Sequence, residues 1–435
     1  MPSQLTGTND RLAFRRIAPI LLGLLGMAAN VSAQLESDAV PHARTIAPSE
    51  AIRQQLEDSR YRLGPMRVRP LFSLRDLGYD NNVLGTSANQ VADFHSTVGL
   101  GVHGILPMGS KMYIRALILP EYTWYQKLTN LRSFGGSYGG SLLGLFNRMS
   151  LEAGADTFRG PTILNSEQER SVLGTRSNVF GRAEVEILQR LSVYGSAEGQ
   201  QQRYSTVRDA QTEQTALQQL ERNETAARGG LRYRFASWLD FSLGGERTNT
   251  RFRAATDRDN HSDAVILGVH YDRPRSFINL SVGSRTGKAD HPGVFPDYSA
   301  TTGSYYASHQ LSAPVAFDLY GHRGIGYSLS TTNPYYLETR NGVGATVAVG
   351  RRLALRGFGE GGSNAYPLPF LVGSNQVRRT DKALTAGGGV AIRLYRKVAL
   401  SVLASNSRYT SNIAGNDRSI FRLTTGLSFT GDFFR

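Results

Sequence analysis

In several stretches of this sequence, arginines lie two or four residues apart. Arg67 and Arg69 share one stretch, and Arg228, Arg232 and Arg234 share another. In a strand such side chains project from one face, because successive residues point to opposite faces. A row of guanidinium groups can bind anions, so these residues are the main functional signal. The complete set of candidates on polar strand faces is Arg67, Arg69, Arg75, Arg115, Arg182, Arg228, Arg232, Arg234, Arg285, Arg356, Arg393 and Arg422.

Carboxylates occupy the same polar faces and offer a second interpretation of the arginines. They are Glu121, Glu152, Asp156, Glu184, Glu186, Glu198 and Asp240. Many of these arginines would then form ion pairs that stabilise the wall between neighbouring strands. Only the arginines without a carboxylate partner would make the lumen prefer anions. Both interpretations stay open at this point.

Motifs that would indicate catalysis or cofactor binding lack the context they need. Gly99–Gly104 fits the dinucleotide pattern, but a strand and not a helix is predicted to follow it. His261, Ser262 and Asp263 are consecutive, and neighbours on a strand cannot form a catalytic relay. The eight histidines show no metal-ligand spacing. We therefore expect no enzyme activity, no cofactor and no metal.

The elements that position the arginines are strands with a period of two. In the final stretch Phe421, Leu423, Thr425, Leu427 and Phe429 share one face, opposite a polar face. The same alternation begins near Pro65 and continues through the chain. Alternating stretches separated by turn residues are the signature of a transmembrane β-barrel, in which the polar face lines a wet lumen. The predicted fold is all-β, a transmembrane antiparallel up-and-down β-barrel.

Turn signals set the number of strands. Eight tight turns, such as Asn147-Arg148 and Arg396-Lys397, alternate with nine longer polar segments, which include 160–175, 206–222 and 366–380. This count predicts about 18 strands, within a range of 16 to 20. Short turns should face the periplasm and long loops the exterior. A barrel of this size is wide enough for an aqueous channel.

Composition agrees with a barrel and excludes two other classes. The chain has 435 residues, no cysteine and a formal charge of +14. A mean hydropathy of −0.30, with no apolar run of about 20 residues beyond the leader, excludes a helical membrane bundle. The arginines are scattered over the strands and not clustered on a helix, so nucleic acid is not an expected partner.

Three segments are expected. Residues 1–33 resemble a secretory signal peptide, with an apolar stretch from Ile17 to Ala29 and a small-residue cleavage site at Val31-Ser32-Ala33. Residues 34–64 would form a periplasmic segment with a possible short helix after Ser49, acting as a tail, a plug or a docking segment. Residues 65–435 would form the barrel, in the bacterial outer membrane after secretion.

Two further sets of aromatic residues have predicted roles. Tyr113 and Tyr194 face inward and could stack on sugar rings, whereas most other aromatic residues near strand ends fit interfacial girdles. Phe429, Phe433 and Phe434 resemble the C-terminal signal read by the barrel-assembly machinery, although Arg435 follows them.

The first strand carries a resemblance to a known family. Leu63–Pro70 reads LGPMRVRP and continues to Gly78-Tyr79-Asp80-Asn81-Asn82. This resembles the opening of a family of outer-membrane β-barrel porins encoded in exopolysaccharide and capsule loci. The resemblance covers about twenty residues. It implies an exit pore for a secreted polysaccharide, embedded in the lipid of the outer membrane. Together with the arginine-rich strand faces, it favours a passive conduit for an anionic polysaccharide, and this conduit would work with periplasmic and inner-membrane export machinery.

Composition and spacing alone indicate only a pore. The alternatives are a general porin for small anionic solutes, a structural or adhesive barrel, and an integral outer-membrane hydrolase.

Overall fold

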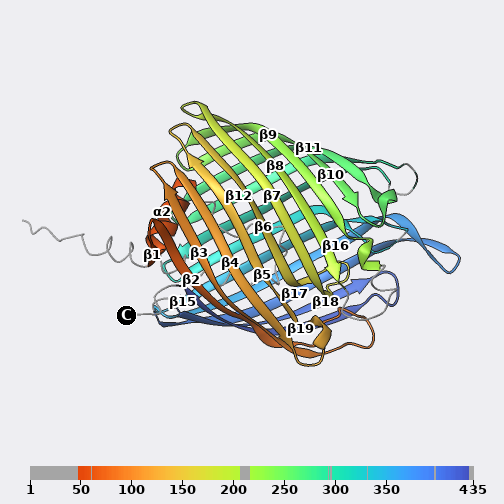
Figure 1. Ribbon diagram of the computed structural model, residues 1–435. Coiled ribbons are helices and arrows are strands. Elements are labelled where there is room, and N and C mark those ends of the chain that lie inside the picture. Colours follow the sequence, from red (N-terminus) through yellow and green to blue (C-terminus); the bar gives the residue numbers. More distant parts are fainter. Residues whose placement is uncertain are drawn as a thin grey trace, which may run out of the picture.

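The chain closes into one antiparallel barrel in the computed structural model, which describes residues 48–59, 61–205, 216–291, 293, 296–330, 332–395 and 398–430 (Figure 1). Helix α2 (Pro48–Asp58) and the short strand β1 (Tyr61–Leu63) precede the barrel. Two single-turn 3-10 helices lie between strands, η1 (Thr129–Leu131) and η2 (Thr256–Arg258). The predicted leader 1–33 lies outside the described residues.

The barrel wall consists of 18 strands. The first nine are β2 (Met66–Asp80), β3 (Asp93–Met108), β4 (Met112–Tyr125), β5 (Ser133–Leu145), β6 (Met149–Ile163), β7 (Ser171–Leu188), β8 (Leu191–Ser205), β9 (Arg222–Ala236) and β10 (Leu239–Phe252). The others are β11 (Asn260–Arg273), β12 (Ser276–Ala289), β13 (Tyr298–Ser312), β14 (Val315–Tyr327), β15 (Tyr335–Val349), β16 (Leu353–Val372), β17 (Asn375–Tyr395), β18 (Val398–Ser411) and β19 (Arg418–Thr430). The prediction of an 18-stranded barrel is confirmed.

Closure occurs between β19 and β2, where Arg422 pairs with Asp80 and Phe429 with Phe72. All other wall strands pair with their neighbours in sequence. Closure leaves no unpaired strand edge in the wall. We call the end with the short connections the turn end and the opposite end the loop end; α2 and β1 lie at the turn end (Figure 1).

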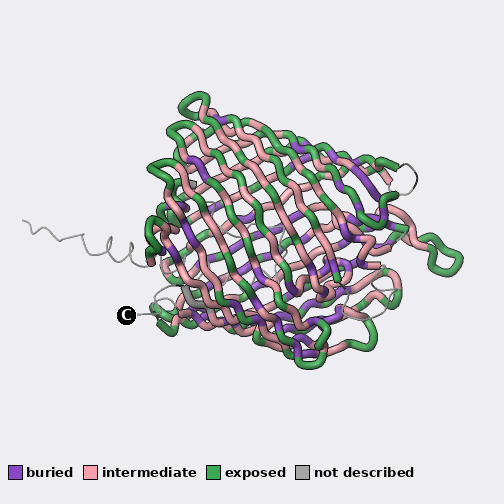
Figure 2. Tube along the Cα trace, viewed as in Figure 1, coloured by how far each residue is buried: buried purple, intermediate pink, exposed green. Residues whose placement is uncertain are grey.

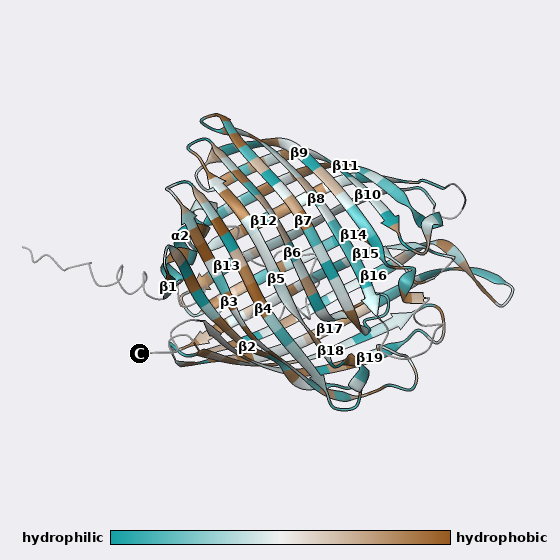
Figure 3. Ribbon diagram, in the orientation of Figure 1, coloured by the Kyte–Doolittle hydropathy of each residue, from teal (hydrophilic) through white to brown (hydrophobic). Residues whose placement is uncertain are grey.

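Hydrophobic residues alternate with hydrophilic ones along the strands, as Figure 3 shows. Leu231, Leu243 and Leu267 are about half exposed and lie on the outer face, on neighbouring strands. Buried residues gather toward the loop end, where many of them are polar (Figure 2). The barrel therefore has an apolar outer wall and a polar interior that is most tightly packed near its loops.

One predicted loop is wrong. The polar segment 366–380 was expected to be a long loop, but β16 continues to Val372 and β17 begins at Asn375. The two strands form a ribbon that projects beyond the wall at the loop end (Figure 1). Pro367 and Pro369 lie within β16, and proline is tolerated in strands that lack a neighbour on one side.

Candidate functional site

The loop 164–170 crosses the lumen. It connects β6 to β7, and its contacts lie on β15, β16, β17 and β19. In an 18-stranded wall, β15 is nine strands from β6 in either direction, so the two are diametrically opposite. We call this segment the crossing loop. It was predicted to face outward with the other long loops, as part of 160–175, and in the structure it turns inward.

Polar side chains attach the crossing loop to the opposite wall. The hydroxyl of Ser166 lies 3.0 Å from that of Tyr336, and Asn165 Nδ2 donates to the carbonyl of Tyr327 over 3.0 Å. Tyr336 is 1% exposed, so the attachment is shielded from water. The backbone of Glu169 has a φ of 51°, an uncommon value for a residue other than glycine. These contacts hold the loop in one conformation.

Two carboxylates complete the attachment. Glu167 pairs with Arg379 at 3.2 Å, and Glu169 pairs with Arg422 at 3.5 Å. Arg379 also makes two hydrogen bonds to Asp381, at 2.7 and 2.9 Å. Burial disfavours its charge, but these hydrogen bonds raise the pKa of Arg379 above its ordinary value. Arg379 therefore stays charged at the loop end and maintains its ion pair with Glu167.

A second loop, described at 328–330 and 332–334, folds inward and meets the first. The backbone N–H of Leu329 donates to Glu167 Oε2 over 3.2 Å. Arg258, which is 3% exposed, donates to the carbonyls of Ser328 and Ser330 at 2.9 and 2.8 Å. The two loops brace each other inside the barrel mouth.

A chamber of about 900 Å³ lies beside the crossing loop. Strands β2–β8 and β15–β19 contribute its walls. The lining is rich in charge of both signs. Its charged side chains are Arg75, Arg176, Arg340 and Arg422 with Asp76, Asp80, Glu121, Glu169, Glu338 and Glu360.

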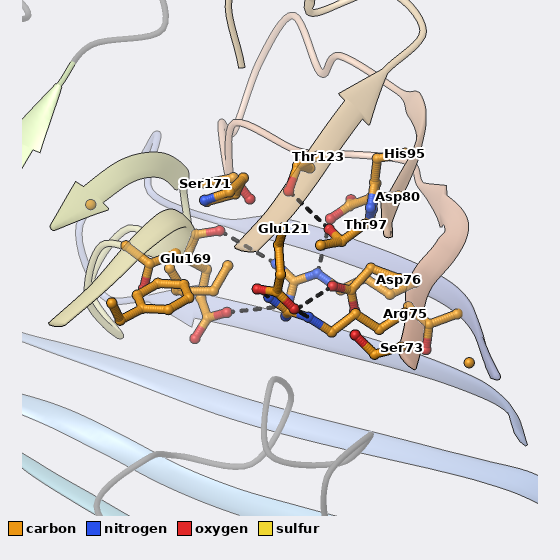
Figure 4. Close-up of a pocket in the computed structure, with 18 of the residues that line it drawn as sticks. Ser73, Arg75, Asp76, Asp80, His95, Thr97, Glu121, Thr123, Glu169 and Ser171 are labelled. Carbon is orange, nitrogen blue, oxygen red and sulfur yellow. Dashed lines mark hydrogen bonds and ion pairs between the residues drawn. The ribbon is translucent and has the colours of Figure 1, made fainter. Parts of the chain in front are cut away.

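Three of the four chamber arginines are paired. Arg75 binds Glu121 through two hydrogen bonds of 3.0 and 2.7 Å, the bidentate geometry that a guanidinium forms with a carboxylate (Figure 4). Arg422 lies 2.9 Å from Asp80, across the closure of the barrel. Arg340 lies 3.5 and 3.9 Å from Glu338 and Glu360. Among the described residues, Arg176 has no carboxylate partner.

The predicted arginines occupy the inner face, and most of them have partners. Seven pair with carboxylates of the barrel: Arg75 with Glu121, Arg115 with Glu152, Arg228 and Arg285 with Glu246, Arg232 with Glu184, Arg234 with Asp240, and Arg422 with Asp80. Arg69 lies 3.8 Å from Asp58 of α2, and the Arg182 guanidinium lies 4.9 Å from the Phe180 ring centre. Arg67, Arg356 and Arg393 are half-buried on β2, β16 and β17, and the last two also interact with neighbouring groups.

The two tyrosines proposed to stack on sugars lie in different surroundings. Tyr113 lines a cavity at the turn end together with Ile52 and Arg53 of α2. Tyr194 lies over Gly230 and Gly244, where an added Cβ would clash with its hydroxyl, and Arg232 covers its ring at 5.6 Å. Phe429 lies on β19, and Phe433 and Phe434 lie outside the described residues.

The motifs set aside on sequence grounds form no site in the structure. The His261 ring contacts Asp290 at 2.7 Å, whereas the Ser262 hydroxyl accepts from Arg285 at 2.8 Å on the inner face. Within the described residues, no group of histidine and carboxylate side chains could hold a metal ion. No helix in that part of the chain is long and apolar enough to cross a membrane.

Sequence reasoning missed the residues that fasten the crossing loop. Glu167, Glu169 and Arg379 carried no signal, because the ion pairs that fasten the loop join residues more than 200 positions apart along the chain. Arg176 was missed for another reason. It follows directly after the segment that was taken for an outward loop.

Comparison with known proteins supports the fold. No family model matches the sequence, and neither does any curated protein. A BenF-like porin from Pseudomonas fluorescens Pf-5 is similar in structure, with a TM-score of 0.51 at 12% identity over 85% of this chain and 99% of that chain. The fold is similar to that of outer-membrane porins. OccK2 (OpdF) from Pseudomonas aeruginosa, in complex with glucuronate, gives a TM-score of 0.50 at 12% identity over 83% and 98% of the two chains.

Proposed function

We propose that this protein is an outer-membrane pore for small polar solutes, with a preference for anions. The observation that supports this function most directly is the crossing loop. It spans the lumen and is fastened at its far side by two ion pairs and by Ser166. A polysaccharide in transit would have to break these attachments, whereas small solutes fit the chamber of about 900 Å³ beside the loop. Polymer export, implied by the first-strand resemblance, is the weaker alternative.

Arg176 supports the preference for anions. It lines the chamber, and the other three arginines there are held by carboxylates. Its guanidinium is exposed to the lumen and can donate two parallel hydrogen bonds to a carboxylate. The OccK2 structure in complex with glucuronate, a sugar acid, is compatible with such a substrate class here.

Liposome swelling tests both parts of this function. Vesicles containing the full chain should swell in glucose and faster in glucuronate, and they should exclude a dextran. R176Q should reduce the glucuronate rate severalfold and leave the glucose rate nearly unchanged. R159Q is a matched control, because Arg159 is an exposed arginine on the outer face of the neighbouring strand β6.

Two outcomes would contradict the proposal. Passage of dextran at a rate similar to that of glucose would favour a polymer conduit. Equal loss of both small-solute rates in R176Q would mean that Arg176 supports the wall and does not select anions.

A further inference from the structure

One row of inner-face residues crosses four adjacent strands of the chamber wall. Strand register pairs Phe158 of β6 with Arg176 of β7, and Arg176 with Gln202 of β8. On the other side of Phe158 lies Ser137 of β5. All four residues line the chamber beside the crossing loop. We call them the lumenal row. Because the Cβ atoms of paired residues lie about 4.5–5.5 Å apart, a hydroxyl, an aromatic ring, a guanidinium and an amide stand side by side.

The polar side chains of the lumenal row are available to a solute. Among the described residues, the side chains of Ser137, Arg176 and Gln202 have no hydrogen-bond or ion-pair partner. Gln202 takes part in the contacts of the wall through its backbone carbonyl, which accepts from Arg203 at 2.8 Å. Its amide therefore keeps both its donor and its acceptor capacity.

The next row toward the turn end contributes two more amides on the same face. Asn178 is paired with Gln200, and each lies two residues from its neighbour in the lumenal row. The Nδ2 of Asn178 donates to Asp156 at 3.1 Å, whereas its Oδ1 is buried without a hydrogen-bond partner. A buried acceptor of this kind is uncommon in proteins, and a donor group from a solute would satisfy it.

A sugar acid has the groups that this arrangement matches. Its six-membered ring presents faces of C–H groups, an edge of hydroxyls and a carboxylate at one end. A guanidinium binds a carboxylate through two parallel hydrogen bonds, and an aromatic ring offers an apolar surface to a C–H face. An amide donates and accepts hydrogen bonds, as a sugar hydroxyl does. An inorganic anion would use Arg176 and leave the rest of the row without a contact.

We infer that the lumenal row binds sugar acids. Arg176 holds the carboxylate, Phe158 packs against one face of the ring, and Gln202 and Ser137 form hydrogen bonds with its hydroxyls. This inference rests on the proposed function and goes further, because it separates sugar acids from other organic anions of the same charge and size. A site built for hydroxyls rejects an analogue that lacks them, since its polar groups lose water without gaining a partner.

Block of the ion current through single channels tests this inference with the full chain in planar bilayers. Glucuronate is compared at neutral pH with cyclohexanecarboxylate, which has the same charge and a ring of the same size but no hydroxyls. Glucuronate should block at about tenfold lower concentration, the effect of one or two hydrogen bonds. R176Q should weaken the block by both anions to a similar degree, because both carry a carboxylate.

Two variants separate recognition of the sugar from recognition of the charge. Q202L should weaken the block by glucuronate severalfold and change that by cyclohexanecarboxylate by less than about twofold, because only the sugar hydrogen-bonds to the amide. Its matched control is Q201L, since Gln201 is exposed on the outer face one residue away. F158L keeps an apolar side chain but removes the flat ring, and it should also weaken the block by glucuronate severalfold. F134L is its control, because Phe134 is exposed on the outer face of β5.

Heat-dependent gel mobility shows whether each variant is folded. Equal block by the two anions in the unmodified pore would overturn the inference, and so would an unchanged block by glucuronate in folded Q202L or folded F158L. If R176Q still weakens the block by both anions in that case, the proposed anion pore stands and only the sugar site is lost. An unchanged block by glucuronate in R176Q would contradict the inference and the proposed anion preference together.

Discussion

Arginine has different surroundings in the lumen and at the turn end. In the lumen, Arg75 is held by Glu121 and Arg232 by Glu184, at 2.7 and 2.6 Å. At the turn end, Arg351 and Arg352 are exposed, and their turn contains no carboxylate. One group of arginines is paired with carboxylates of the protein and holds the wall together. The other is exposed in a turn that contains no carboxylate.

This difference shows that net charge is a poor guide to the selectivity of a pore. A formal charge of +14 suggests a basic lumen, yet the chamber lining contains more carboxylates than arginines. Part of the positive charge lies at the turn end, for example in the turn 350–352, which contains no carboxylate. The anion preference proposed above depends instead on Arg176, the chamber arginine that has no carboxylate partner among the described residues.

The largest expected effect comes from releasing the crossing loop. E167Q/E169Q keeps the side-chain length but removes both ion pairs to Arg379 and Arg422. The loop should leave its position for part of the time, and single-channel conductance in planar bilayers should rise severalfold and fluctuate. D263N is the control, because Asp263 pairs with Arg247 in an exposed position on the outer face. An unchanged conductance in E167Q/E169Q would show that the loop does not limit the pore.

Local sequence patterns predicted the wall well and the loops poorly. A period of two is fixed by strand geometry, so each strand could be recognised from its own residues, as in β19 with Phe421 and Leu423. The direction of the crossing loop depends on Arg379 and Arg422, which lie on the far wall. No window of neighbouring residues contains that information.

For the candidate site, the sequence indicates which face of the wall each arginine occupies but not which residue it pairs with. Alternation predicted that Arg228 and Arg232 share the inner face, because residues an even number of positions apart on a strand point to the same side. It could not assign Glu246 and Glu184 as their partners, since that choice depends on strand register and on the reach of each side chain. Their pairing turns a predicted row of positive charge into a series of ion pairs.

A lumenal pair allows a direct test of this neutralisation. R232Q should leave Glu184 uncompensated and shift the reversal potential in a salt gradient toward cations. R232Q/E184Q removes both charges and should return the reversal potential close to that of the unmodified pore. If the single and double variants give the same shift, Arg232 acts independently of Glu184 and the lumen is not balanced pair by pair.

The smallest expected effects are on stability, and they should differ between the lumen and the turn end. Glu121 is 6% exposed, so E121Q leaves Arg75 without its bidentate partner in a poorly hydrated place. The free energy of unfolding in urea, measured in lipid vesicles, should fall by about 1–3 kcal/mol. R351Q, at an exposed turn, should change it by no more than about 0.5 kcal/mol. If the two variants lowered the free energy of unfolding by similar amounts, the turn arginines would also stabilise the barrel. The contrast between the lumen and the turn end would then be wrong.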